Sequence, residues 1–99
     1  MEWLFEVQIM LKSQVSVKLK RGLQARNTVK FFVIAASFEC EIHIIHNGVT
    51  CGINLMDIMN LNVLEEDKII IVANGKDESY AILALKGFLS EGQSDVPFK

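Results

Sequence analysis

The stretch Gly22-Leu23-Gln24-Ala25-Arg26-Asn27 marks the point at which a strand is expected to end and a helix to begin. Residues 15–20 alternate apolar and polar side chains, which is typical of a half-buried strand. Gly22 ends that alternation, and residues 25–37 follow a helical period. The free N–H groups of a first helical turn attract anions, and Arg26 adds a forked donor suited to phosphate or carboxylate. The sequence therefore predicts a candidate anion site at Gln24, Ala25 and Arg26, although Arg26 is also compatible with an ordinary solvated position.

Downstream, the sequence predicts two strands joined by a hairpin, a short helix, a further strand and a last helix. Asn47-Gly48 is a strong signal for a two-residue hairpin turn. Asn54 is a good N-cap for the short helix, and Asp77 can cap the last one. The expected strands are residues 41–46, 49–51 and 68–73, and the expected helices are residues 55–61 and 78–89.

This order of elements predicts an α+β two-layer open-faced sandwich, in which a four-stranded antiparallel sheet carries its helices on one face. In the first helix we expect Val29, Phe32, Val33 and Ala36 to form the inward stripe, with Phe31 and Ala35 beside it. In the strands we expect Ile42, Ile44, Ile69 and Ile71 to face the helices, and Ile45, Ile70 and Val72 to lie on the open face. In the last helix we expect Ala81, Ile82, Leu85 and Leu89 to face inward.

The composition excludes several classes of protein. The 99 residues suffice for one domain, and 51% of them are hydrophobic. A net charge of −2 gives no reason to expect nucleic acid as a partner. No apolar run approaches the roughly 20 residues that span a bilayer. The two cysteines form neither a disulfide framework nor a metal motif. We expect a cytoplasmic protein with no metal and no cofactor.

The segments that carry the strongest signals also resemble one known family. Residues 17–26 resemble the active-site segment of HPr, the phosphocarrier protein of the bacterial phosphoenolpyruvate-dependent sugar phosphotransferase system. Further matches in the same order are Phe38, Asn47-Gly48, residues 55–59 and residues 74–78. The resemblance covers residues 15–90 and implies an HPr-like β-α-β-β-α-β-α domain.

The resemblance also implies two phosphorylation sites that this sequence lacks. Family members usually carry histidine where Gln24 stands and proline where Asn27 stands, and many carry a kinase-modified serine at the position of Asn54. A carboxamide offers only hydrogen bonds, whereas imidazole has a free lone pair that accepts a phosphoryl group. Gln-Ala-Arg resembles the catabolite-repression paralogue of HPr, which keeps the serine. The chain is therefore expected to be a divergent, non-catalytic regulatory member, with Asn54 as a degenerate regulatory site and a helix cap.

Partners implied by the resemblance are enzyme I, the HPr kinase or a transcriptional regulator. In the family, an exposed apolar patch docks these proteins, and exposed methionines suit an adaptable interface. The matching positions here predict a docking surface at Arg26, Leu55, Met56 and Met59. The competing interpretation is that the three apolar residues belong to the core.

Two other functions stay open at this stage. The chain could carry phosphate on another acceptor, most plausibly His43 or His46, although each reads as a lone surface histidine. On a strand, positions three apart face opposite sides, so these two cannot chelate one metal. Thr28 is the only hydroxyl near the anion site. Alternatively, an HPr fold could serve as an oligomeric scaffold of unrelated role.

Residues 1–14 have no counterpart in a typical HPr, and they are strongly apolar. We expect this N-terminal extension to pack on the sheet or extend it, either by folding back at residues 12–14 or as an arm that forms a homodimer. Val7, Ile9 and Leu11 alternate in step with Val15 and the strand that follows, whereas a helix with Trp3, Leu4, Val7 and Leu11 on one stripe is the competing local interpretation. Residues 91–99 are expected to form a flexible tail.

Overall fold

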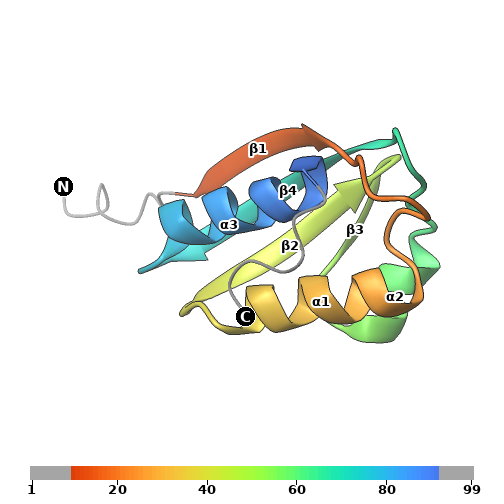
Figure 1. Cartoon of the computed structure of the whole chain (residues 1–99). Helices are drawn as coiled ribbons and strands as arrows, with labels where there is room; N and C mark the ends of the chain where they lie inside the picture. The colour runs from red at the N-terminus through yellow and green to blue at the C-terminus, as the bar shows by residue number, and fades with distance from the viewer. Residues whose placement is uncertain (1–9, 92–99) are drawn as a thin grey trace, which may run out of the picture.

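The computed structural model describes residues 10–91 and contains four strands and three helices within them. Residues 10–91 form one sheet with the helices packed against it (Figure 1). In chain order the elements are β1 Leu11–Ser16, α1 Ala25–Ala36, β2 Cys40–His46, β3 Val49–Cys51, α2 Leu55–Asn60, β4 Lys68–Gly75 and α3 Glu78–Glu91.

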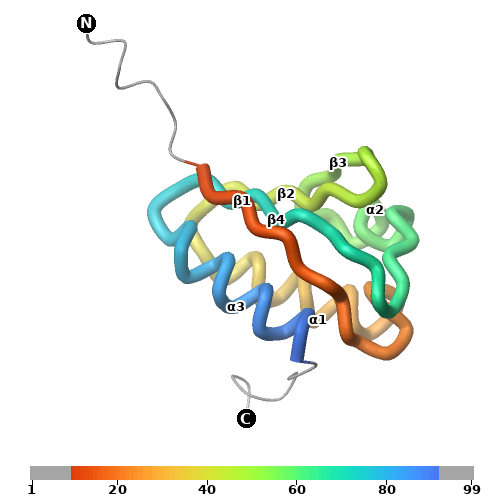
Figure 2. Tube along the Cα trace, turned by 90° about the horizontal axis from the view of Figure 1, so that it is seen from above, coloured from red at the N-terminus to blue at the C-terminus, as the bar shows by residue number. Residues whose placement is uncertain are grey.

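The sheet is antiparallel throughout and has the strand order β1-β4-β2-β3. Figure 2 shows the strands in one layer, with α1 and α3 together in a second layer beneath them. The predicted α+β open-faced sandwich is therefore confirmed. The apolar core lies between the layers, where Ile42, Ile44, Ile69 and Ile71 face the helices as expected.

Several local predictions hold because strong short-range signals specify them. The turn between β2 and β3 places Asn47 at φ 51° and Gly48 at φ 80°, and such positive values at both positions suit a tight hairpin. Asn54 caps α2, with its side chain accepting a hydrogen bond from the Asp57 N–H at 3.1 Å. The four residues predicted to face inward from α3 are all buried, and Phe88 joins them.

The first strand begins and ends earlier than the sequence predicted. β1 is Leu11–Ser16 instead of residues 15–20, and it pairs with β4 from Leu11↔Ala73 to Ser16↔Lys68. Pairing stops there because β4 begins at Lys68. The next backbone groups bond elsewhere, as Val17 N–H does to the carbonyl of Asp67 at 2.8 Å. The inward alternation nevertheless continues beyond the strand, and both Val17 and Leu19 are buried.

This position of β1 changes the interpretation of the N-terminal extension. Residues 12–14 lie inside a strand, so the chain does not fold back there. Leu11 packs partly against the core, in phase with Val15. The rest of the proposed extension, residues 1–9, lies outside the described residues, as do residues 92–99 of the expected tail. The homodimer expected through the extension stays a prediction.

The inward face of α1 differs from the prediction. Its buried residues are Thr28, Phe31 and Ala35. Of the predicted inward stripe, Val29 and Val33 are 48% and 47% exposed, Ala36 is also exposed and Phe32 is half-buried. The helix carries two adjacent apolar stripes, and the periodicity of the sequence does not distinguish them. Packing of α1 against α2 and α3 selects the stripe that contains Phe31 and leaves the other one at the surface.

Candidate functional site

The candidate anion site lies at the start of α1. Gln24 is the N-cap residue in an extended conformation, and its side chain makes no capping hydrogen bond. Within this described turn no acidic side chain offsets the positive end of the helix dipole. Arg26 is the second residue of α1 and its side chain is exposed. Ala25 has φ 44°, in the left-handed region where a non-glycine residue is strained by about 1–2 kcal/mol.

Two contacts hold the loop that precedes this site. Gly22 lies so close to the segment after α2 that a Cβ atom there would be 2.1 Å from the Val63 carbonyl oxygen. The neighbouring Leu23 N–H donates to that same oxygen at 3.0 Å. Gly22 also has φ 55°, which glycine adopts without steric cost. The loop is therefore anchored to the segment that leads from α2 to β4.

Asn27 is a further element of the site that the sequence did not reveal. Its Nδ2 donates to the carbonyls of Lys20 at 2.9 Å and Gly22 at 2.8 Å. The Asn27 side chain thus holds the loop that precedes Gln24 against the first turn of α1. The only sequence signal was an asparagine near a helix start, which is equally typical of a solvated position.

Thr28 is fully buried in the first turn of α1. Its hydroxyl oxygen is buried without a hydrogen-bond partner among the described residues. A buried hydroxyl is inaccessible to a kinase, so the structure argues against Thr28 as a phosphate acceptor. Burial of Thr28 follows from the choice of the Phe31 stripe as the inward face.

The predicted apolar docking residues of α2 are largely at the surface. Met56 is 61% exposed, Leu55 is also exposed and Met59 is half-buried. The buried residue of this short helix is Ile58, which supplies its core contact. The interpretation of Leu55, Met56 and Met59 as core residues therefore fails for the first two.

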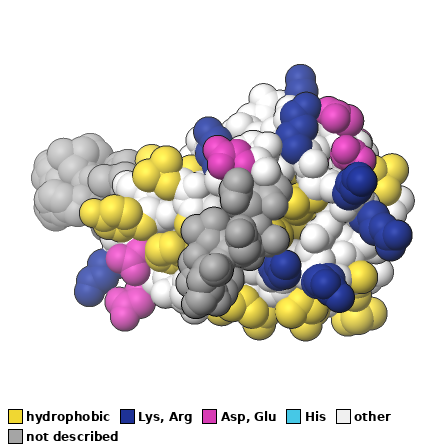
Figure 3. Space-filling view, viewed as in Figure 1, with side chains coloured by type: hydrophobic (Ala, Val, Ile, Leu, Met, Phe, Trp, Pro, Cys, Tyr) yellow, Lys and Arg dark blue, Asp and Glu magenta, His cyan; other side chains and the backbone are white. Residues whose placement is uncertain are grey.

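α1, which packs against α2, also carries exposed apolar residues. They are Val29 and Val33, which the sequence analysis had placed in the core. Figure 3 shows hydrophobic side chains along the lower rim, where Figure 1 places α1 and α2, with Lys and Arg side chains directly above them. An apolar strip bordered by positive charge suits a protein partner with a complementary acidic rim.

The two histidines have different environments, and His46 corrects the expectation of a surface residue. His46 is 6% exposed, with Nδ1 at 2.9 Å from the Leu61 carbonyl and Nε2 at 3.1 Å from the Asp67 carboxylate. Neither ring nitrogen is accessible to a phosphate donor. His43 is half-buried and lies on the opposite face of β2, as the strand period predicted.

Both cysteines are free, half-buried thiols. Burial raises the pKa of the Cys40 thiol, and the Asp77 and Glu78 carboxylates raise it further. Burial also raises the pKa of Cys51, with a second contribution from Asp57. Both thiols are therefore poor nucleophiles at neutral pH. The described residues include no cluster of three potential metal ligands and no helix long and apolar enough to cross a membrane.

Comparisons with known proteins agree on one family. The family model described as "PTS HPr component phosphorylation site" matches residues 11–91. The HPr-like protein Crh of Halalkalibacterium halodurans is 36% identical over 83 residues, which are 83% of this chain and 99% of the relative. The HPr-like protein Crh of Bacillus subtilis is 30% identical over 83 residues, which are 83% of this chain and 98% of the relative. The crystal structure of the phosphocarrier protein HPr from Bacillus anthracis has a TM-score of 0.80 at 34% identity and covers 82% of this chain and 98% of its own.

Proposed function

This chain belongs to the HPr family, and from that premise we propose that it is a non-catalytic regulatory protein of the sugar phosphotransferase system. It binds partner proteins and does not relay phosphate. The observation that carries this proposal is the carboxamide of Gln24 at the N-cap of α1. A carboxamide donates and accepts hydrogen bonds but has no free lone pair on nitrogen for a phosphoryl group.

The surroundings of Gln24 support recognition of an anionic group. The uncapped first turn of α1 and the exposed Arg26 present donors and positive charge at the same place. A carboxylate or phosphate of a partner protein suits this arrangement. Asn54 serves as the cap of α2 and has no hydroxyl for a kinase to modify, so neither position supports phosphorylation.

The partner surface in this proposal is Arg26 together with Leu55, Met56 and Met59, extended by the exposed valines of α1. Its partners are proteins of the HPr type, such as enzyme I, the HPr kinase or a transcriptional regulator. Such partners imply a cytoplasmic protein. The alternative of a displaced phosphate acceptor loses support at His46, because that ring is buried and both of its nitrogens are engaged.

Phosphorylation is tested by intact mass after incubation with enzyme I and phosphoenolpyruvate, and separately with the HPr kinase and ATP. We expect no added phosphoryl group in either reaction, while an HPr control in the same tube is labelled. The variant Gln24→His restores an imidazole beside Arg26, and we expect enzyme I to phosphorylate it. Gln24→Ala is the matched control that stays unlabelled. A labelled wild-type chain would overturn the non-catalytic function.

Binding is tested by titration of purified enzyme I and of purified HPr kinase. Arg26→Ala and Met56→Asp should each weaken the interaction by about 1–2 kcal/mol, which is roughly 5- to 30-fold in affinity. Tyr80→Asp is the matched control, because Tyr80 is equally exposed but lies on α3. Equal loss in all three variants, or no binding by the wild type, would contradict the proposed surface.

A further inference from the structure

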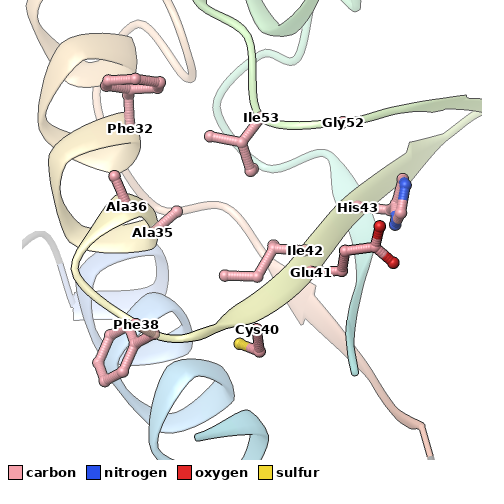
Figure 4. A pocket seen from close by; sticks show the side chains of 10 residues that line it. All are labelled: Phe32, Ala35, Ala36, Phe38, Cys40, Glu41, Ile42, His43, Gly52 and Ile53. Carbon is pink, nitrogen blue, oxygen red and sulfur yellow. The ribbon is translucent and has the colours of Figure 1, made fainter. Parts of the chain in front are cut away.

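A groove lies at the other end of α1, away from Gln24. It has a volume of about 420 Å³, within the range of ligand pockets, which is about 300–1,000 Å³. Figure 4 shows side chains from α1, from β2 and from the segment after β3 around the same space, with Ile53 pointing towards α1. The apolar lining includes Phe32, Ala36, Phe38, Ile42 and Ile53.

The groove lies beside an open strand edge. β3 pairs with β2 only at Ile44, Ile45 and His46, so residues 40–43 have no strand beside them on that side within residues 10–91. Along one edge of an antiparallel strand, every second residue points its N–H and C=O groups towards the neighbouring strand. His46 is such a residue, because it pairs with Val49 across the two-residue turn. Ile44 and Ile42 are the next residues with this orientation. The backbone groups of Ile44 pair with β3, whereas Ile42 lies beyond the end of β3. An extended peptide could therefore bind this edge through backbone hydrogen bonds.

The start of the described chain lies at the same end of the sheet. Leu11 pairs with Ala73, and Ala73 pairs with Ile42, which lines the groove. Two strand spacings of about 4.8 Å place the Leu11 and Ile42 Cα atoms about 10 Å apart. The nine residues that precede Met10 can span about 30 Å when extended, at about 3.3 Å per residue. About three of these residues are enough to cross that distance, so about the first five or six residues of the chain remain to lie in the groove.

The composition of these nine residues matches the lining of the groove. In an extended conformation Trp3, Phe5, Val7 and Ile9 share one face, because side chains alternate along a strand. Aromatic side chains bury large apolar areas, and here they would meet Phe32 and Phe38. A segment tethered this closely has an effective concentration of about 1 mM or more, which favours the same molecule over a second copy.

We propose that the first part of residues 1–9, with Trp3 and Phe5, docks in this groove of the same chain along the open edge of β2, and that the residues next to Met10 connect it to β1. The docked segment completes the apolar lining between α1 and β2. The groove lies at the C-terminal end of α1, so docking does not require any of the residues in the proposed partner surface.

Trp3 is the only tryptophan in the chain, so its fluorescence reports directly on this docking. We expect a blue-shifted emission and protection from acrylamide in the full chain. Ala36→Arg places a charge on the exposed rim of the groove and should shift the emission towards that of tryptophan in water. Val29→Arg, on the same helix but outside the groove, should leave the emission unchanged. Circular dichroism checks that both variants keep the fold.

A disulfide test locates the segment independently. In Phe5→Cys combined with Cys51→Ser, mild oxidation should form an intramolecular disulfide with Cys40, which requires Cα atoms within about 7 Å. In Phe5→Cys combined with Cys40→Ser, the remaining partner is Cys51, and little intramolecular disulfide should form with it. Solvent-like emission in the wild type, unchanged emission in Ala36→Arg, or a disulfide-linked dimer in place of the monomer would each overturn the proposal.

Discussion

Replacing Asn27 with alanine removes the two hydrogen bonds that tie the loop before Gln24 to α1. The bond to the Gly22 carbonyl, at 2.8 Å, is part-buried, whereas the bond to the Lys20 carbonyl, at 2.9 Å, is exposed. In the variant, water can donate a hydrogen bond to the exposed Lys20 carbonyl in place of Asn27. Water reaches the part-buried Gly22 carbonyl less well, so that carbonyl loses more. The expected loss of unfolding free energy is therefore about 1–2 kcal/mol, most of it from the Gly22 contact. For a domain of this size that corresponds to a decrease of about 4–16 °C in Tm.

The assay is urea unfolding followed by circular dichroism, with amide hydrogen exchange of the Leu23 N–H as a local readout. Asn27→Asp keeps the shape but offers no donor, so it should also be destabilised, although the helix N-terminus offsets part of the loss by about 0.3–1 kcal/mol. Asn60→Ala, at the exposed end of α2, is the matched control and should change stability by less than about 0.5 kcal/mol.

Two results would refute this reasoning. The first is an Asn27→Ala variant whose stability equals that of the control. The second is a loss of stability in which the hydrogen exchange of the Leu23 amide does not increase relative to that of core amides. Leu23 lies in the loop held by Asn27 and donates to the Val63 carbonyl, so its exchange reports on the order of that loop. In that case Asn27 would contribute to stability without ordering the loop that positions Gln24.

Three further outcomes are expected. Gly22→Ala should destabilise the fold by about 2–4 kcal/mol in urea unfolding, because its Cβ would lie 2.1 Å from a backbone carbonyl oxygen at φ 55°; a loss below about 1 kcal/mol would contradict this close approach. Asp67→Ala should cost about 1–3 kcal/mol by the same measurement, because it leaves the buried His46 ring without its carboxylate partner, and a neutral variant would show that the contact contributes nothing. Alkylation of Cys51 at pH 8 should be slower in the native chain than in urea, because burial raises its pKa, and Asp57→Asn should speed it in the native chain by removing a charge that raises the pKa further; equal native and urea rates would count against this.

Several parts of the fold could be predicted from sequence because their signals are local. Asn47-Gly48 fixes a turn whose positive φ values few residue pairs tolerate, and it sets the register of β2 against β3. Asn54 caps α2 through a contact only three residues away. In α3 the four positions predicted to face inward follow the helical period and are buried, although Leu83 is also apolar and lies exposed on the other side.

Of the candidate site, the sequence predicted the junction at Gln24, the exposed Arg26 and the surface position of Met56. It did not predict that Val29 would lie at the surface, nor that His46 would be buried. α1 carries two apolar stripes, and only its packing against α2 and α3 decides between them.

Residue identity and spacing by themselves determined the order of the elements, the hairpin, the cap of α2 and the absence of imidazole at position 24. Tertiary structure alone decided the contacts between segments far apart in the chain. β1 ends at Ser16 because its partner strand begins at Lys68, and His46 is buried because Leu61 and Asp67 approach its two ring nitrogens. Such contacts depend on which segments the folded chain brings together, and local periodicity carries no information about that pairing.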